Sequence, residues 1–233
     1  MLETLFSTVP CESQIHLFGL VHLLVITRSI ISAFLIIKYK KESILLEKLS
    51  TLIILGMQLI LYGWYYFSPE KFIIMALPLY TCRLVLYLYI GGIFFKNKFC
   101  LKLATYWGFF GGIAGLLFPV IFDYPFPHVL QITTFMLHTY IFLMSTNYLF
   151  VKKIGMNKED TMMCCKCTVS FLIFTTVFNI ILGSNYMSTL GTTIQLSNFI
   201  FKVPTILCFI TVTVGYLIAI FIQHKIVEKY TNN

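Results

Sequence analysis

The chain has 233 residues, of which 58% are hydrophobic and only 11% are charged. Soluble domains are typically about a quarter charged, so one water-soluble core cannot hide this much apolar surface, and lipid is the expected solvent. The formal net charge is +8, but the basic residues flank the hydrophobic segments instead of forming one patch. We therefore expect no nucleic-acid partner, and membrane lipids are the expected partners.

Seven apolar runs are long enough to cross a bilayer, because a transmembrane helix needs about 20 mostly apolar residues. In chain order they cover residues 15–37, 49–67, 72–95, 99–121, 127–150, 163–184 and 199–223. The connections are short, and no alternating pattern suggests a β-barrel. These features predict an all-α polytopic membrane protein, with one transmembrane domain over residues 1–233.

Lysines predict the orientation of the spans. They gather after spans one, three and five and at the C-terminus, whereas the opposite side has only Lys71 and Lys202. The lysines on the first side are Lys38, Lys40, Lys41, Lys48, Lys96, Lys98, Lys102, Lys152, Lys153, Lys158, Lys166, Lys225 and Lys229. Basic residues favour the cytoplasmic side, so the N-terminus is expected outside and the C-terminus inside.

Two arginines lie near the middle of predicted spans, Arg28 in the first and Arg83 in the third. No Asp or Glu falls within a predicted span, and Asp123 is the nearest acid in sequence. A charge in hydrocarbon is costly and usually marks a functional site, so these arginines favour an anionic ligand such as a phosphate head group. In the alternative reading Arg28 extends to the interface, and Arg83 binds carbonyls freed near Pro78.

Polar residues form a stripe along each of two spans. The stripe in the fifth span contains His128, Gln131, Thr134, His138 and Ser145, and the stripe in the sixth contains Thr168, Thr175, Asn179, Gly183 and Tyr186. Helical spacing places each set on one face, which should point away from lipid. With His22 of the first span, they predict a polar cavity open to the outer leaflet. A hydrogen-bond network that only holds the helices together is the alternative.

Cys82 and His138 are expected at the same depth, because they lie eleven and twelve residues into spans that run in the same direction. A thiol beside an imidazole and an arginine can act as an activated nucleophile, which suits acyl transfer through a thioester. A packed, inert thiol is the alternative. Cys164, Cys165 and Cys167 form a cluster that no histidine or acid completes as a zinc site, so neither a metal nor a soluble cofactor is expected.

Four motifs together resemble the YwaF-type family of small bacterial integral membrane proteins. They are LPLYTCRL in span three, the turn DYPFPH, QITTFMLHTY in span five and FNIILGSNYM closing span six. The resemblance covers roughly residues 15 to 223 in the same order. It implies seven spans in a bacterial cytoplasmic membrane. A related eukaryotic branch is described as phospholipid acyltransferases with a cysteine as acyl carrier, which implies a role in lipid metabolism.

Carried over by position, the resemblance implies Cys82 as the nucleophile, His138 as the base and Arg83 as a phosphate-binding residue. Many relatives have His where this chain has Tyr80, which leaves His138 as the base here. The resemblance also implies pocket-lining roles for Asn179, Asn185 and Tyr186.

Our leading hypothesis is a membrane-embedded acyltransferase that acts on phospholipid or another lipid. Cys82 and His138 would be catalytic. The expected substrate-binding residues are Arg83, Asn179, Asn185, Tyr186, Gln131, His128, Asp123, Arg28 and His22. One alternative is a non-enzymatic transporter or receptor for a small anionic or lipidic ligand. Another is a structural partner of other membrane proteins, for which neither Cys82 nor His138 would matter. The sequence gives no oligomeric state.

Overall fold

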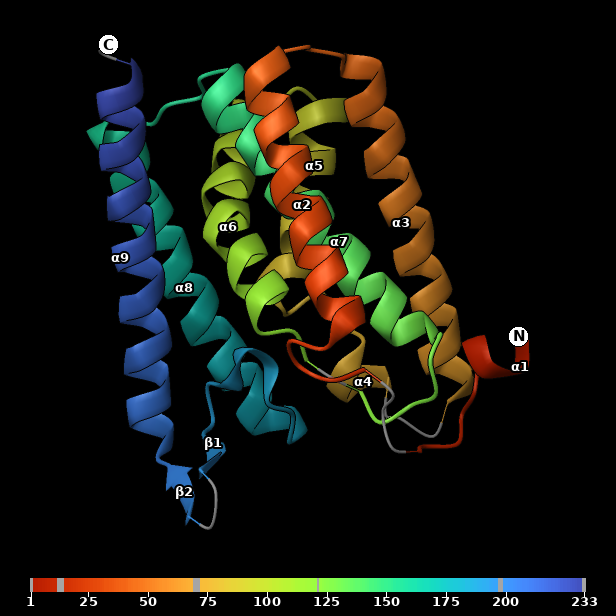
Figure 1. Cartoon of the computed structure of the whole chain (residues 1–233). Helices are drawn as coiled ribbons and strands as arrows, with labels where there is room; N and C mark the ends of the chain where they lie inside the picture. The colour runs from red at the N-terminus through yellow and green to blue at the C-terminus, as the bar shows by residue number, and fades with distance from the viewer. Residues whose placement is uncertain (1, 12–14, 69–71, 121, 197–198, 232–233) are drawn as a thin grey trace. The chain divides into compact units, whose positions relative to one another are not determined.

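The computed structural model describes residues 2–11, 15–68, 72–120, 122–196 and 199–231 (Figure 1). The chain divides into two compact units, each described by itself below. The first unit contains Met1–Pro69 and Cys82–Ile154, and the second contains Glu70–Thr81 and Gly155–Asn233.

The first unit is a helical bundle in which α7 is the central element. Its elements are α1 (Leu2–Leu5), α2 (Leu20–Tyr39), α3 (Ile44–Phe67), α5 (Thr81–Phe94, with Thr81 counted in the second unit), α6 (Lys98–Leu117), α7 (Val129–Thr146) and the π-helix η1 (Asn147–Val151). Helix α7 packs most closely along α6 and also contacts α2 and α3 (Figure 1). Small residues allow the close approach: a Cβ added at Gly112 of α6 would lie 2.8 Å from the backbone nitrogen of Phe142.

The second unit contains a pair of long helices, α8 (Lys158–Leu182) and α9 (Thr205–Thr231), which lie side by side (Figure 1). The one-turn helix α4 (Phe72–Met75), the 3-10 turn η2 (Tyr186–Ser188) and strands β1 (Thr192–Leu196) and β2 (Phe199–Val203) complete it. The strands pair antiparallel, from Thr192 with Val203 to Leu196 with Phe199. This hairpin is an addition to the all-α architecture that the sequence predicts.

Six helices are long and apolar enough to cross a membrane: α2, α3, α6, α7 continued by η1, α8 and α9. The multi-pass helical class is therefore confirmed. The last span was predicted to begin at residue 199, which lies in β2; the helix instead begins at Thr205, after Pro204, because the residue before a proline disfavours helical geometry.

The predicted third span, 72–95, is interrupted. Pro78 lies between α4 and α5, where a proline removes a backbone donor and clashes with the preceding turn. The remaining helix, α5, has 14 residues and is about 21 Å long, shorter than the hydrocarbon core of about 30 Å. The seven-span count, the orientation and the single transmembrane domain stay predictions.

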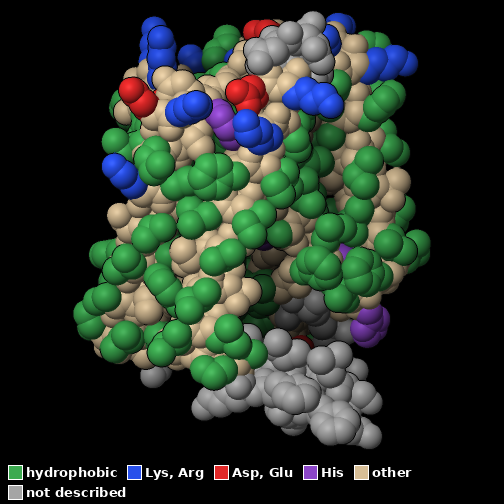
Figure 2. Space-filling view, turned by 90° about the vertical axis from the view of Figure 1, so that its left-hand side faces the viewer, with side chains coloured by type: hydrophobic (Ala, Val, Ile, Leu, Met, Phe, Trp, Pro, Cys, Tyr) green, Lys and Arg blue, Asp and Glu red, His purple; other side chains and the backbone are tan. Residues whose placement is uncertain are grey.

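Many large hydrophobic side chains are exposed along the candidate spans, as lipid contact requires. Helix α2 exposes Leu24 and Phe34, and helix α9 exposes Leu207 and Phe221. On the face drawn in Figure 2, hydrophobic side chains cover the long middle zone and Lys and Arg side chains gather toward one end. This distribution is typical of a helix surface that passes through a bilayer.

Candidate functional site

The structure brings Cys82 of α5 and His138 of α7 together. The thiol and the imidazole are hydrogen-bond partners, and both groups interact electrostatically with Arg83. All three residues belong to the first unit. Of the side chains that the sequence singled out, these three make a group with the composition of an activated nucleophile.

The interruption at Pro78 decides where Cys82 lies in its helix. Because α5 starts at Thr81, Cys82 falls in the first turn, where backbone N–H groups have no partner within the helix. The backbone N–H of Arg83 donates to the Cys82 sulfur. The Arg83 side chain is 8% exposed, and its guanidinium lies 5.7 Å from the centre of the Tyr65 ring. A helix start and a nearby cation are the surroundings in which cysteine thiolates are stabilised.

A backbone carbonyl fixes the tautomer of His138. Its Nδ1 lies 2.8 Å from the carbonyl oxygen of Thr134. A carbonyl can only accept, so Nδ1 carries the proton and Nε2 of the neutral ring keeps its lone pair. Nε2 is thus the nitrogen left to accept the Cys82 proton. The arrangement has the three parts of an activated nucleophile: the thiol, its base and a group that orients the base.

His22 and His128 are held by main-chain partners, which favours a structural role for both. His22 is fully buried; its Nδ1 accepts from the N–H of Phe18 at 2.8 Å, and its Nε2 donates to the carbonyl of Leu116 at 2.6 Å. His128 caps α7 by accepting from the N–H of Leu130 at 3.3 Å, and it donates to the carbonyl of Ser7 at 3.0 Å.

His128 is stacked on Tyr124, with ring centres 4.4 Å apart. Burial lowers the pKa of the His128 imidazole below its usual value, and the hydrogen bond to Ser7 partly opposes this shift. His128 is therefore neutral at pH 7, as its cap to α7 requires.

Asp123 lies in the turn before α7, and Gln131 lies in the first turn of α7. The Gln131 amide donates to the carbonyls of Phe122 and Tyr124 at 3.2 and 3.1 Å. The Asp123 side chain is exposed, and the backbone carbonyl of Asp123 accepts from the N–H of Cys11 at 2.9 Å. These contacts favour the hydrogen-bond network over the polar cavity for this part of the predicted set.

Three further candidates, Asn179, Asn185 and Tyr186, lie in the second unit, where they organise the segment after α8. The buried Asn179 donates to the Tyr186 carbonyl and Thr189 Oγ1 at 2.8 and 2.9 Å, and its oxygen accepts from the Tyr186 N–H at 2.9 Å. Tyr186 Oη accepts from the N–H of Leu77 at 3.1 Å. Asn185 is exposed and binds the backbone of residues 190 and 191. These contacts support a structural role for Asn179 and Asn185.

Arg28 lines a second feature, a groove between α2, α3 and α7 with a volume of about 530 Å³. Lys41 lies in the same lining. Arg28 and Lys41 are exposed, and neither has an ion-pair partner among the residues that the structure describes. The volume falls in the range of about 300–1,000 Å³ that is usual for small-molecule sites.

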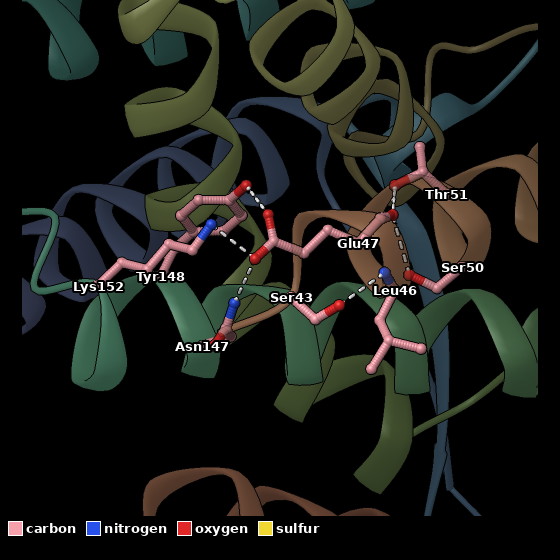
Figure 3. Close-up of polar contacts among 8 residues, drawn as sticks. All are labelled: Ser43, Leu46, Glu47, Ser50, Thr51, Asn147, Tyr148 and Lys152. Carbon is pink, nitrogen blue, oxygen red and sulfur yellow. Dashed lines mark hydrogen bonds and ion pairs between the residues drawn. The ribbon is translucent and has the colours of Figure 1, made fainter. Parts of the chain in front are cut away.

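An acidic residue that was not among the predicted site residues, Glu47, lies in this groove wall. Figure 3 shows its carboxylate beside Asn147 and Tyr148 of η1 and Lys152, which directly follows η1. Glu47 forms an ion pair with Lys152 at 2.6 Å and accepts hydrogen bonds from Asn147 at 3.1 Å and Tyr148 at 2.6 Å. Glu47 is 4% exposed, and the ammonium group of Lys152 balances its negative charge inside the protein.

The prediction that no acid lies within a span is therefore wrong for α3, which starts at Ile44 instead of residue 49 and includes Glu47. The signal was present in the sequence. Ser43 caps the helix by accepting from the N–H of Leu46 at 3.3 Å, and a serine before an apolar run predicts a helix start.

One comparison with known proteins finds a match. A model of the TMEM164 family matches residues 13–224, nearly the whole chain. The chain therefore belongs to the TMEM164 family, a multi-pass membrane family. No curated protein and no solved structure matches the chain.

Proposed function

We propose that this member of the TMEM164 family is an acyltransferase, acting within a bacterial cytoplasmic membrane on phospholipid or another lipid. The observation that carries the proposal is the contact of Cys82 with His138 at the start of α5. The YwaF-type resemblance supports the same chemistry. Membrane lipids would be both the donor and the acceptor of the acyl group.

The first half-reaction would load the enzyme. Nε2 of His138 takes the proton from the Cys82 thiol, and the thiolate attacks the ester carbonyl carbon of the donor lipid. The carbon–oxygen ester bond breaks as the carbon–sulfur bond is completed. The leaving alkoxide takes the proton back from the imidazolium. The products are a lyso-lipid and an acyl thioester on Cys82.

The second half-reaction would release the acyl group. His138 removes the proton from the hydroxyl of an acceptor lipid, whose oxygen attacks the thioester carbonyl. The carbon–sulfur bond breaks, and the proton passes from the imidazolium to the thiolate of Cys82. Arg83 would hold the lipid phosphate, because a guanidinium suits oxyanions. The Thr134 carbonyl keeps the base in the same tautomer through both steps.

The test is intact-mass spectrometry of the purified protein after incubation with mixed bacterial phospholipids. The wild type should gain an acyl mass that hydroxylamine removes and that maps to Cys82. Cys82→Ser should lack the thioester, whereas the control Cys100→Ser, which changes another cysteine of the first unit, should retain it. No adduct on Cys82 while lipids stay bound would overturn the proposal.

The groove that contains Arg28 and Lys41 supports a second candidate function, a transporter or receptor for a small anionic or lipidic ligand. Its cations and its volume are the favourable observations. In this case Arg28→Gln and Lys41→Gln should weaken the binding of an anionic lipid, because each removes a cation from the lining of the groove. Cys82→Ser should leave this binding unchanged, which separates the two candidates.

A further inference from the structure

The imidazole of His138 occupies the space that a side chain at Gly115 would need. A Cβ added at Gly115 of α6 would lie 1.9 Å from Cδ2 and 2.2 Å from Nε2 of His138. Both distances are far below the usual separation of non-bonded atoms, about 3.5–4.0 Å between carbons. One of the atoms that overlap is the nitrogen that faces the Cys82 thiol.

The surroundings leave the ring little room to move. Nδ1 is bound to the Thr134 carbonyl at 2.8 Å, and the ring is also the partner of Cys82. Helices α6 and α7 are in close contact at Gly112, which lies against the backbone of Phe142. Moving the two helices apart would break this packing. A methyl group at position 115 would therefore displace the imidazole more readily than the helices.

We propose that Gly115 is a positioning residue for the Cys82–His138 pair. Its missing side chain creates the space in which Nε2 faces the sulfur. This inference rests on the proposed function, because it assumes that His138 acts on the thiol. The need for glycine here is steric: alanine is the better helix former by about 1 kcal/mol, so helix propensity alone would favour the substitution.

The same helix provides two matched controls within one turn of Gly115. Gly111 has nothing within 4 Å of an added Cβ, so Gly111→Ala tests the addition of a methyl group alone. Gly112→Ala would press on the backbone of Phe142 and so tests disturbed packing of α6 on α7 without touching the ring. Gly115→Ala is the only one of the three that overlaps the imidazole.

The measurement is the rate of Cys82 alkylation by a membrane-permeable maleimide over pH 6 to 9, mapped by mass spectrometry, together with the melting temperature. Gly115→Ala should slow alkylation at least tenfold near neutral pH and reproduce the pH profile of His138→Ala. Adding it to His138→Ala should have no further effect. Gly111→Ala should stay within twofold of the wild type, and Gly112→Ala should lower the melting temperature while keeping the wild-type profile.

Three results would overturn the inference: a wild-type profile for Gly115→Ala, a further loss when it is added to His138→Ala, or a His138→Ala profile that matches the wild type. Failure of acyl transfer is a separate outcome. If alkylation depends on His138 and Gly115 but no acyl thioester forms on Cys82, the positioning role stands and the proposed transfer fails.

Discussion

The two faces of α7 are built in opposite ways. The face with His138 is closed: the ring lies against Gly115, its Nδ1 is bound to the backbone, and the thiol is in contact. The face with Thr139 and Tyr140 is open and forms one wall of the 530 Å³ groove. A fixed base suits a chemical step, because reacting groups must be held in place, whereas an open groove suits binding.

The functional difference between the two faces of α7 is tested best by substituting two neighbouring residues, His138 on one face and Thr139 on the other. His138→Gln should lower the rate of thioester formation by about 10² to 10⁴-fold, the usual contribution of a general base. Thr139→Val should change it less than twofold, because Thr139 points to Ser29 of α2, at 3.1 Å. The rate is measured by intact mass over time. Equal losses in both variants would mean that the faces are not functionally separate.

Removing the charge of Glu47 should mainly affect the open face. Glu47→Gln leaves Lys152 without its counter-ion, and breaking a buried pair typically costs about 3–5 kcal/mol. Because Lys152 is 19% exposed, we expect a smaller loss of unfolding free energy, about 2 kcal/mol. Thermal unfolding in detergent measures it, with the exposed Glu42→Gln as control. Alkylation of Cys82 in the folded variant should keep the wild-type rate; a slower rate would show that the two faces are coupled.

Both faces of α7 depend on the start of the helix, where His128 is the N-cap. Because His128 can titrate, the stability of the helix should depend on pH. Burial lowers the pKa of His128 in the folded protein. The neutral imidazole therefore contributes its full share of the folding free energy above the pKa of the unfolded chain, about 6.5. This share is lost as the pH falls below that value toward the folded pKa. The wild type should therefore melt at a lower temperature at pH 5.5 than at pH 7.5. His128→Asn keeps a capping side chain but cannot titrate.

The difference in melting temperature between pH 7.5 and pH 5.5 should therefore be smaller for His128→Asn than for the wild type. An unchanged difference would assign the acid sensitivity to another group. His128→Ala should lose the cap itself, at a cost of about 1 kcal/mol.

The smallest expected effect concerns the bond that joins α2 to the open face. Ser29→Ala removes the hydrogen bond to Thr139, and bonds between membrane helices average about 0.6 kcal/mol. Ser32→Ala, on the same helix, is the control. A loss well above 1 kcal/mol in chemical denaturation would mean that the groove wall depends on this contact more than its single hydrogen bond explains.

Hydropathy alone located the six long helices, because lipid contact imposes long apolar runs. Counting residues also placed Cys82 and His138 at one depth, since both helices rise by the same amount per residue. The interruption near Pro78 could be read as a kink, but the sequence did not indicate that it would put Cys82 in the first turn of a helix.

Other parts of the site could not be read from the sequence. His22 and His128 resemble ligands in a polar stripe, yet their partners are main-chain carbonyls of Leu116 and Ser7, 94 and 121 residues away. Every residue type has a backbone carbonyl, so the sequence does not show which residue will supply the acceptor. The space that Gly115 leaves for His138 could not be predicted either. A glycine in an apolar helix is normally interpreted as a residue that lets helices pack closely.

The orientation of the base by the Thr134 carbonyl has a consequence for how this site is dissected. Every L-amino acid at position 134 supplies the same oxygen, so scanning side chains would pass over one of the three groups that define the chemistry. Thr134→Ala should leave the imidazole in its tautomer. The group is reached only by altering the main chain itself, for example by replacing that peptide bond with an ester, whose carbonyl is a weaker acceptor.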